Sequence, residues 1–268
     1  MRIRKPTAHY KNSLVSPVWV TLSVIALLAG ADAAPAQVTA ARQGDPLASV
    51  PKGLPSVIQH QMQALGARMR TAGKEETVFD AQFVDDVGRR KPIHVVYQIS
   101  GMIRIEGIHD KTALAFDGDF THGVADRTDE SILDTFVMDT PEGMLYSLRK
   151  GASMVLLGHG FGPDARVAPD YKGPRYDIYV VTAPDRTHRA GALQSRRFYF
   201  DSSTGLLAST RYSDSAGFNV ETRFLNWEHV DGSAYPRTVE RYENGRLVFS
   251  ITVASVAGRS ARNAVNFQ

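Results

Sequence analysis

The sequence has 268 residues, with 31 Lys and Arg against 28 Asp and Glu, and a formal net charge of +3. It contains no Cys, which excludes disulfide bonds and thiolate metal sites. Residues 1–33 hold four of the basic residues and one acid, so the remainder carries 27 of each. Residues 34–268 therefore carry equal numbers of basic and acidic side chains and have no basic stripe, which does not favour nucleic-acid binding.

Residues 1–33 have the three parts of a secretory signal peptide. Four Lys and Arg side chains in the first eleven residues precede the apolar run Val18–Ala29 and a small-x-small site. We expect export to the periplasm with cleavage after Ala33 or Ala36. Retention as an N-terminal anchor is the alternative, although the apolar run is short for a membrane span. Residues 34–53, rich in Pro and Gly, predict a flexible lead-in.

The chain from residue 54 begins with a helical pattern and then changes to strands. A helix is predicted to begin at Ser56 and to end at Gly73. Its apolar residues recur at intervals of three and four and form one stripe: Leu54, Ile58, Met62, Leu65 and Met69. From Glu75 the period is two, which predicts strands over Thr77–Phe83, Ile93–Ile99, Met102–Glu106 and Ala113–Phe116.

The middle of the sequence predicts two short helices. The first covers Asp129–Met138, where apolar residues have helical spacing. The second has Thr140 as N-cap and Pro141 in its first position, and it stops at Gly151. Residues 157–174 are rich in Gly and Pro, and this composition predicts a loop.

Alternation resumes at Tyr176–Val181 and dominates the last quarter of the chain, as in Phe218–Phe224. Turn residues separate the strands, and Asn244-Gly245 favours a type I′ hairpin turn. We expect four or five antiparallel strands between Arg196 and the end of the chain. The order of helix, strands, helices and strands predicts an α+β fold, with an antiparallel sheet covered by helices on one side.

The sequence holds no catalytic, phosphate-binding or zinc-binding motif that we recognise. Residues 158–162 (GHGFG) are interpreted as a tight connection between helix and sheet. We therefore predict no enzyme activity, no metal and no cofactor. A hydrolase that uses His122 or His159 with Asp119 or Asp164 is the catalytic alternative.

Four short motifs resemble those of the LolA-like family of periplasmic lipoprotein carriers. They are Ile99–Glu106, Ala115–Gly118, Phe198–Leu207 and Val230–Pro236. The resemblance covers residues 54–268. It implies an incomplete antiparallel β-barrel of about eleven strands, with a helical lid over its concave face and an apolar cavity for acyl chains. The proline expected before Arg104 is replaced by Gly101-Met102, as in a diverged member.

The sequence thus predicts a periplasmic carrier for acylated ligands, either lipid or lipoprotein, without covalent chemistry. Its expected partners are the acyl chains and the transport components of the two membranes. The alternative is an envelope sensor or assembly module that binds a protein partner through the same fold. Met side chains suit adaptable apolar surfaces, with ordinary core packing as the alternative reading. The candidate cavity residues are Met62, Met69, Phe136, Met144, Leu145, Leu148, Phe200 and Phe224.

Overall fold

The computed structural model describes residues 56–66, 75–98, 101–161, 173–184 and 192–260. All of them belong to one unit, Pro35–Gln268. The expected signal peptide (residues 1–33), the lead-in (34–53) and Met69 lie outside the described residues. Among the described helices, none has the length and apolar composition needed to cross a bilayer.

The described strands form a single open sheet of twelve, in which every neighbouring pair runs antiparallel. Its order is β5-β4-β3-β2-β1-β12-β11-β10-β9-β8-β7-β6. The strands are β1 (Glu75–Asp85), β2 (Arg90–Gln98), β3 (Ile103–Glu106), β4 (Leu114–Phe116), β5 (Thr121–His122), β6 (Ser153–Phe161), β7 (Arg175–Pro184), β8 (Leu193–Asp201), β9 (Leu207–Ser213), β10 (Asn219–Val230), β11 (Ser233–Glu243) and β12 (Arg246–Ser260).

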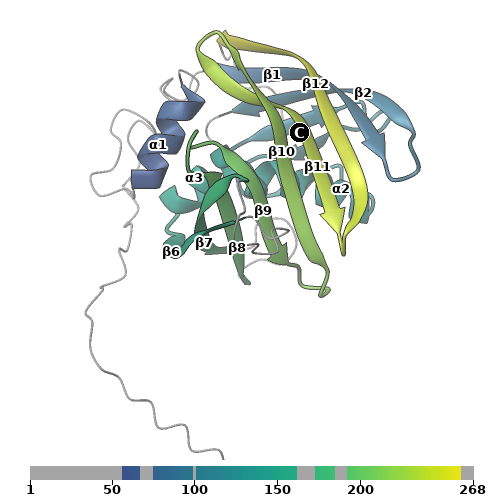
Figure 1. Ribbon diagram of the computed structural model, residues 1–268. Helices are drawn as coiled ribbons and strands as arrows, with labels where there is room; N and C mark the ends of the chain where they lie inside the picture. The colour runs from purple at the N-terminus through teal and green to yellow at the C-terminus, as the bar shows by residue number, and fades with distance from the viewer. Residues whose placement is uncertain (1–55, 67–74, 99–100, 162–172, 185–191, 261–268) are drawn as a thin grey trace, which may run out of the picture. The chain divides into compact units, whose positions relative to one another are not determined.

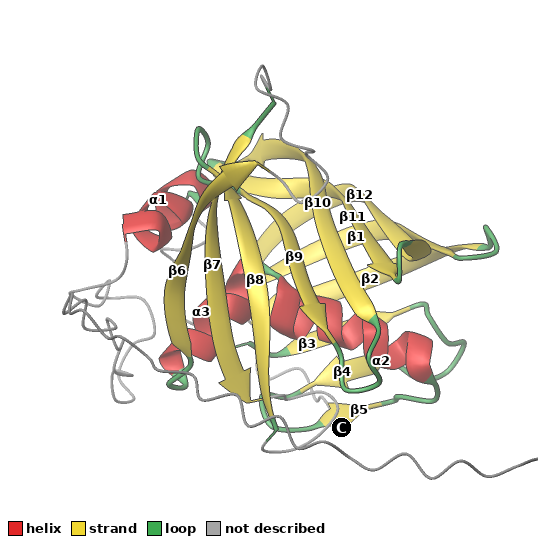
Figure 2. Ribbon diagram, turned by 60° about the horizontal axis from the view of Figure 1, so that its bottom comes forward, coloured by secondary structure: helices red, strands yellow, loops and turns green. Residues whose placement is uncertain are grey.

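The sheet consists of two meanders joined by their outer members. Strands β1 to β5 follow one another, as do β6 to β12, and β1 pairs with β12 over the register Glu75↔Ser260 to Asp85↔Phe249. The strands at the two edges, β5 and β6, are the two that the helical connection links in sequence. Figures 1 and 2 show the sheet curving around this connection, as predicted for an incomplete barrel with a lid over its concave face.

The connection, here called the helical segment, runs from Arg127 to Arg149. It contains α2 (Arg127–Asp134), the π-helix η2 (Thr135–Asp139) and α3 (Pro141–Arg149). The prediction of one helix over 129–138 is therefore only half right, because its second half is a π-helix. The predicted cap is confirmed: the Thr140 hydroxyl accepts a hydrogen bond from the Gly143 amide at 3.1 Å, and Pro141 follows it.

The first helix, α1 (Ser56–Leu65), ends earlier than the predicted stop at Gly73. Gly66 follows it with a φ of +75°, and its amide donates to the Met62 and Gln63 carbonyls. A Cβ at residue 66 would lie 2.0 Å from the Gly232 carbonyl oxygen. A glycine is needed there both for the left-handed conformation and for this close approach, and it ends the helix.

The predicted loop over 157–174 is wrong at its start, because β6 continues to Phe161. The bulge between Leu156 and Gly158 gives the reason. Gly158 has a φ of +151° and lies at this bulge, after which the strand pairs with β7 again. Glycine content alone does not distinguish such a bulged strand from a loop. The type I′ turn is confirmed, since Asn244 and Gly245 have φ values of +51° and +78°.

Candidate functional site

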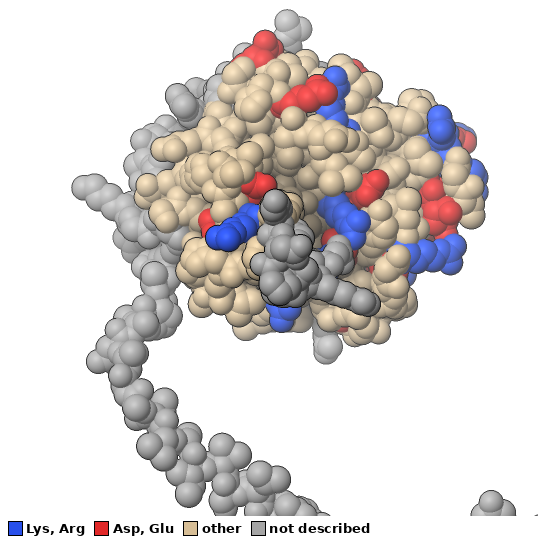
Figure 3. Space-filling model, in the orientation of Figure 1, with Lys and Arg blue, Asp and Glu red and all other residues tan. Residues whose placement is uncertain are grey.

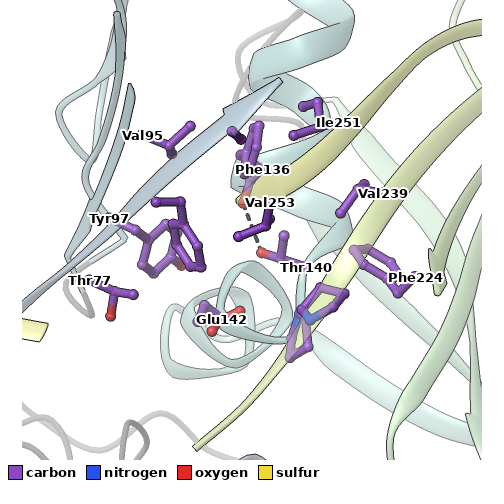
Figure 4. Close-up of a pocket in the computed structure, with 14 residues that line it drawn as sticks. Thr77, Val95, Tyr97, Phe136, Thr140, Glu142, Phe224, Val239, Ile251 and Val253 are labelled. Atoms are coloured by element: carbon purple, nitrogen blue, oxygen red, sulfur yellow. Dashed lines mark hydrogen bonds between the residues drawn. The ribbon is translucent and has the colours of Figure 1, made fainter. Parts of the chain in front are cut away.

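The apolar face of the sheet and the helical segment border a partly open cavity where η2 meets α3. Its volume is about 50 Å³. This is room for a few water-sized groups and not for an acyl chain. We call it the junction cavity (Figure 4). It is lined by Thr77, Phe79, Ala81, Val95, Tyr97, Phe136, Thr140, Pro141, Glu142, Phe224, Pro236, Val239, Ile251 and Val253.

Two of the eight candidate cavity residues, Phe136 and Phe224, line the junction cavity. Phe136 comes from η2, whereas Phe224 lies on the inward face of β10, where it is buried. The other lining residues come mainly from β1, β2, β11 and β12. Their alternation was visible in the sequence, but the pairing of β1 with β12, which brings them together, was not.

The other described candidates are core residues outside this lining. Met144, Leu145 and Leu148 are buried on α3, and Phe200 is buried on β8. Met62 on α1 packs half-buried against the same apolar cluster. The structure thus gathers all seven described candidates into one core but brings only two of them to the cavity wall.

The turn between η2 and α3 fixes the helical side of the cavity. Besides capping α3, the Thr140 hydroxyl donates to the Phe136 carbonyl at 2.8 Å, and Figure 4 draws this bond. A Cβ at residue 143 would lie 2.3 Å from the Val137 carbonyl oxygen. The two helices can therefore approach this closely only with glycine at position 143.

A second part of the site is a buried group of four charged side chains, which we call the arginine–aspartate cluster. Asp134 and Asp139 come from the helical segment, Arg196 from β8 and Arg241 from β11. Arg196 donates to Asp139 at 2.6 Å and to Asp134 at 2.7 Å, and Arg241 donates to Asp134 at 3.2 Å. All four side chains are at most 3% exposed. The charges balance, which such burial requires.

Polar neighbours on the strands complete the cluster. Thr222 donates its hydroxyl proton to Asp139 at 2.6 Å, and Thr210 donates to the Asp139 carbonyl at 3.0 Å. Tyr212 donates to Asp134, and the Arg196 guanidinium lies 4.0 Å from the centre of its ring. The helical segment is thus tied to β8, β9, β10 and β11 by directional bonds, which are worth more when buried and charge-assisted.

The π-helix explains why both carboxylates reach the same cluster. Asp134 and Asp139 are five residues apart. Residues five apart point away from each other on an α-helix, whose neighbours along one face are three or four apart. In a π-helix the hydrogen bonds run over five residues, so positions 134 and 139 come onto one face. The irregular helix is therefore part of the site.

Burial sets the ionisation of the cluster. It raises the pKa of Asp139 to about 6, and Asp134 beside it acts in the same direction, while Arg196 and Arg241 oppose the shift. Burial also raises the pKa of Tyr212 well above its usual value. The pKa of each arginine is raised by its anionic neighbours in spite of burial, so both guanidinium groups stay charged.

The described residues do not assemble the hydrolase site that was the catalytic alternative. His122 contacts Asp117 at 2.8 Å rather than the expected Asp119, and His159 contacts Asp177 at 2.7 Å. Asp164 lies outside the described residues. These pairs are at the surface, and no group of three or more potential metal ligands occurs in the described part of the chain.

Comparison with known proteins identifies the fold. No protein-family model matches the chain, and no curated protein matches it. A LolA superfamily protein from Nitrosomonas europaea superposes with a TM-score of 0.52 at 10% identity, over 78% of this chain and 93% of that one. An outer membrane lipoprotein-sorting protein domain from Vibrio parahaemolyticus gives a TM-score of 0.49 at 9% identity, over 76% and 92%.

The fold is therefore LolA-like, as the sequence motifs predicted. The structure describes twelve strands where the resemblance implied about eleven. The arginine–aspartate cluster was missed at the sequence level. Its signal was present, because Arg196 and Arg241 occupy inward positions of alternating strands, two residues before Phe198 and two after Val239.

Proposed function

We propose that this protein is a periplasmic carrier that binds the acyl chains of a lipid or lipoprotein between the helical segment and the sheet. The junction cavity carries this proposal, because an apolar space remains where two short helices meet the concave face. Neither α2 nor α3, of eight and nine residues, is long enough to be stable alone in water. Their position depends on contacts with the sheet, and those contacts can be exchanged for contacts with a ligand.

A ligand can enter only if the cavity grows, since about 50 Å³ does not hold an acyl chain. The apolar side of the helical segment is the side that can yield. Phe136 is only partly buried, and Thr140, Pro141 and Glu142 line the cavity beside it. Each CH₂ group buried contributes about 0.8 kcal/mol, so a chain of several carbons offsets the loss of a few side-chain contacts. No covalent chemistry is needed.

Ligand uptake by the purified protein tests the proposal directly. The chain without residues 1–33 is stripped of bound lipid and titrated with a fluorescent fatty acid. We expect saturable binding that Phe136→Trp weakens, because the larger ring fills the cavity. Leu145→Met is the matched control, since it changes a buried side chain on α3 that does not line the cavity. Absence of uptake, together with absence of co-purified lipid in native mass spectrometry, would refute the carrier function.

A pull-down from periplasmic extract separates the carrier from the sensor or assembly module. A stoichiometric protein partner bound without lipid would support the latter. Transfer of a bound lipoprotein to membrane vesicles would support the carrier and its expected membrane partners.

A further inference from the structure

The two edges of the open sheet differ in how they are protected. An edge strand presents unpaired backbone groups that can pair with another chain, and proteins usually limit this with short strands, charges or proline. Strand β5 follows that practice. It has two residues, Thr121 and His122, and His122 is paired with Asp117.

Strand β6 lacks most of this protection. It has nine residues, SMVLLGHGF, without Lys, Arg, Asp, Glu or Pro. In the described part of the chain it pairs with β7 on one side and with no strand on the other. The bulge after Leu156 limits pairing there, but it leaves Ser153–Leu156 in regular register with Ser153 opposite Thr182 and Leu156 opposite Tyr179.

The side chains of this edge are apolar and face solvent. Val155, Leu156 and Leu157 are 52%, 44% and 58% exposed. They are consecutive, whereas the other large exposed apolar side chains of the described residues occur singly along the chain. Three adjacent aliphatic groups on an edge that no other described strand covers form a surface that burial would stabilise.

We propose that β6 pairs with β6 of a second copy of this chain, antiparallel and around a two-fold axis, so that two sheets become continuous. The strand is complementary to itself. An antiparallel pairing centred on Val155 lies in the regular part of the strand and brings Val155 of one copy opposite Val155 of the other, with no charged side chain between them.

Charge also permits this partner. Residues 34–268 carry 27 basic and 27 acidic side chains, so no net repulsion opposes association of two copies. On the face drawn in Figure 3, Lys and Arg lie among Asp and Glu rather than forming one large area of a single sign. A partner selected by charge would need such an area, whereas self-association through an uncharged strand does not.

The mass of the protein in solution tests this pairing. Analytical ultracentrifugation of the chain without residues 1–33, over a range of concentrations, is expected to show a monomer–dimer equilibrium. Val155→Lys should weaken the dimer about tenfold or more, because the two-fold axis brings two added like charges close together. Val87→Lys is the matched control, since Val87 is an exposed valine in the β1–β2 turn, and it should leave the dimer unchanged.

Amide hydrogen exchange distinguishes strand pairing from other contacts. The amides of Ser153–Phe161 should exchange more slowly at the concentrations at which the dimer forms. A monomer at all concentrations, or a dimer that Val155→Lys does not weaken, would overturn the proposal. Concentration-independent protection of the β6 amides that point away from β7 would overturn it too, because another segment of the same chain would then cover the edge. Protection only on addition of a different protein would assign the edge to that partner instead.

Discussion

The helical segment contacts two chemically different parts of the concave face. At one, α2 and η2 meet Arg196, Thr222 and Arg241 through hydrogen bonds and ion pairs. At the other, η2 and α3 meet mainly apolar side chains of β1, β2, β10, β11 and β12 around the junction cavity. The two parts are close in sequence, because η2 contributes to both.

The difference suggests how the helical segment can be held in position at one part and still move at the other. Ion pairs in a dry interior are directional, and removing one member leaves the other charge buried and unpaired. Apolar contacts have no such geometry, so they can be exchanged for a ligand at small cost. We therefore expect the arginine–aspartate cluster to hold the position of the helical segment while its apolar side opens.

The largest effect is expected from breaking the cluster. Arg241→Met removes one charge and leaves Asp134 and Asp139 with Arg196 alone. The free energy of unfolding should fall by about 3–5 kcal/mol. Urea denaturation measures this, with Arg246→Met as control: Arg246 is 76% exposed and pairs with Asp86 at the surface, so its loss should stay below about 1 kcal/mol. Equal losses of unfolding free energy in the two variants would show that the arginine–aspartate cluster does not hold the helical segment in place.

Leu148→Ala tests the packed part of α3. Leu148 is buried in the apolar core and does not line the junction cavity. Truncation should cost about 2–5 kcal/mol, as in a close-packed core. Fatty-acid uptake by the fraction that remains folded should be unchanged. A loss of uptake without a loss of stability would extend the binding site to this residue.

The pH dependence of stability tests the charged part without breaking it. The folded pKa of Asp139 is about 6, above its usual 3.8, so the folded state holds the proton more tightly. The stabilising contribution of Asp139 to the free energy of unfolding is fully present below about pH 4 and is lost as pH rises through 6. At about 1.4 kcal/mol per pKa unit, the change is about 3 kcal/mol. Asp139→Asn should remove this slope from urea midpoints measured between pH 4 and 7. An unchanged slope would assign it to other groups.

The smallest effect on stability is expected at the cavity wall. Phe136 is only partly buried and already borders empty space, so Phe136→Ala loses fewer contacts than a core phenylalanine. We expect a loss of about 1 kcal/mol, accompanied by altered uptake of the fluorescent fatty acid. Thermal or urea denaturation and the uptake titration should be done on the same preparation. A loss as large as that of Leu148→Ala, with uptake unchanged, would identify an ordinary core.

The sequence by itself determined much of the local structure. Alternation predicted most strands, Asn244-Gly245 predicted its hairpin turn, and Thr140-Pro141 predicted the start of α3. These features depend on residues a few positions apart, and local conformational preferences decide them. The LolA-like motifs are of the same kind, and the fold they implied was confirmed. The predicted end of α1 at Gly73 was wrong, and no strand was predicted over Ser153–Phe161, where residues 157–161 were assigned to a loop. In both places a glycine had two possible roles.

Only the tertiary structure decided where the site lies. The junction cavity requires β1 to pair with β12, about 170 residues later in the chain, and no local pattern encodes that register. The arginine–aspartate cluster joins residues 57 to 107 positions apart. Each arginine is unremarkable in its own strand. Both become buried because the curved sheet brings four strands under the helical segment, where the π-helix places Asp139 on the same face as Asp134 and the two carboxylates balance the charge of the arginines.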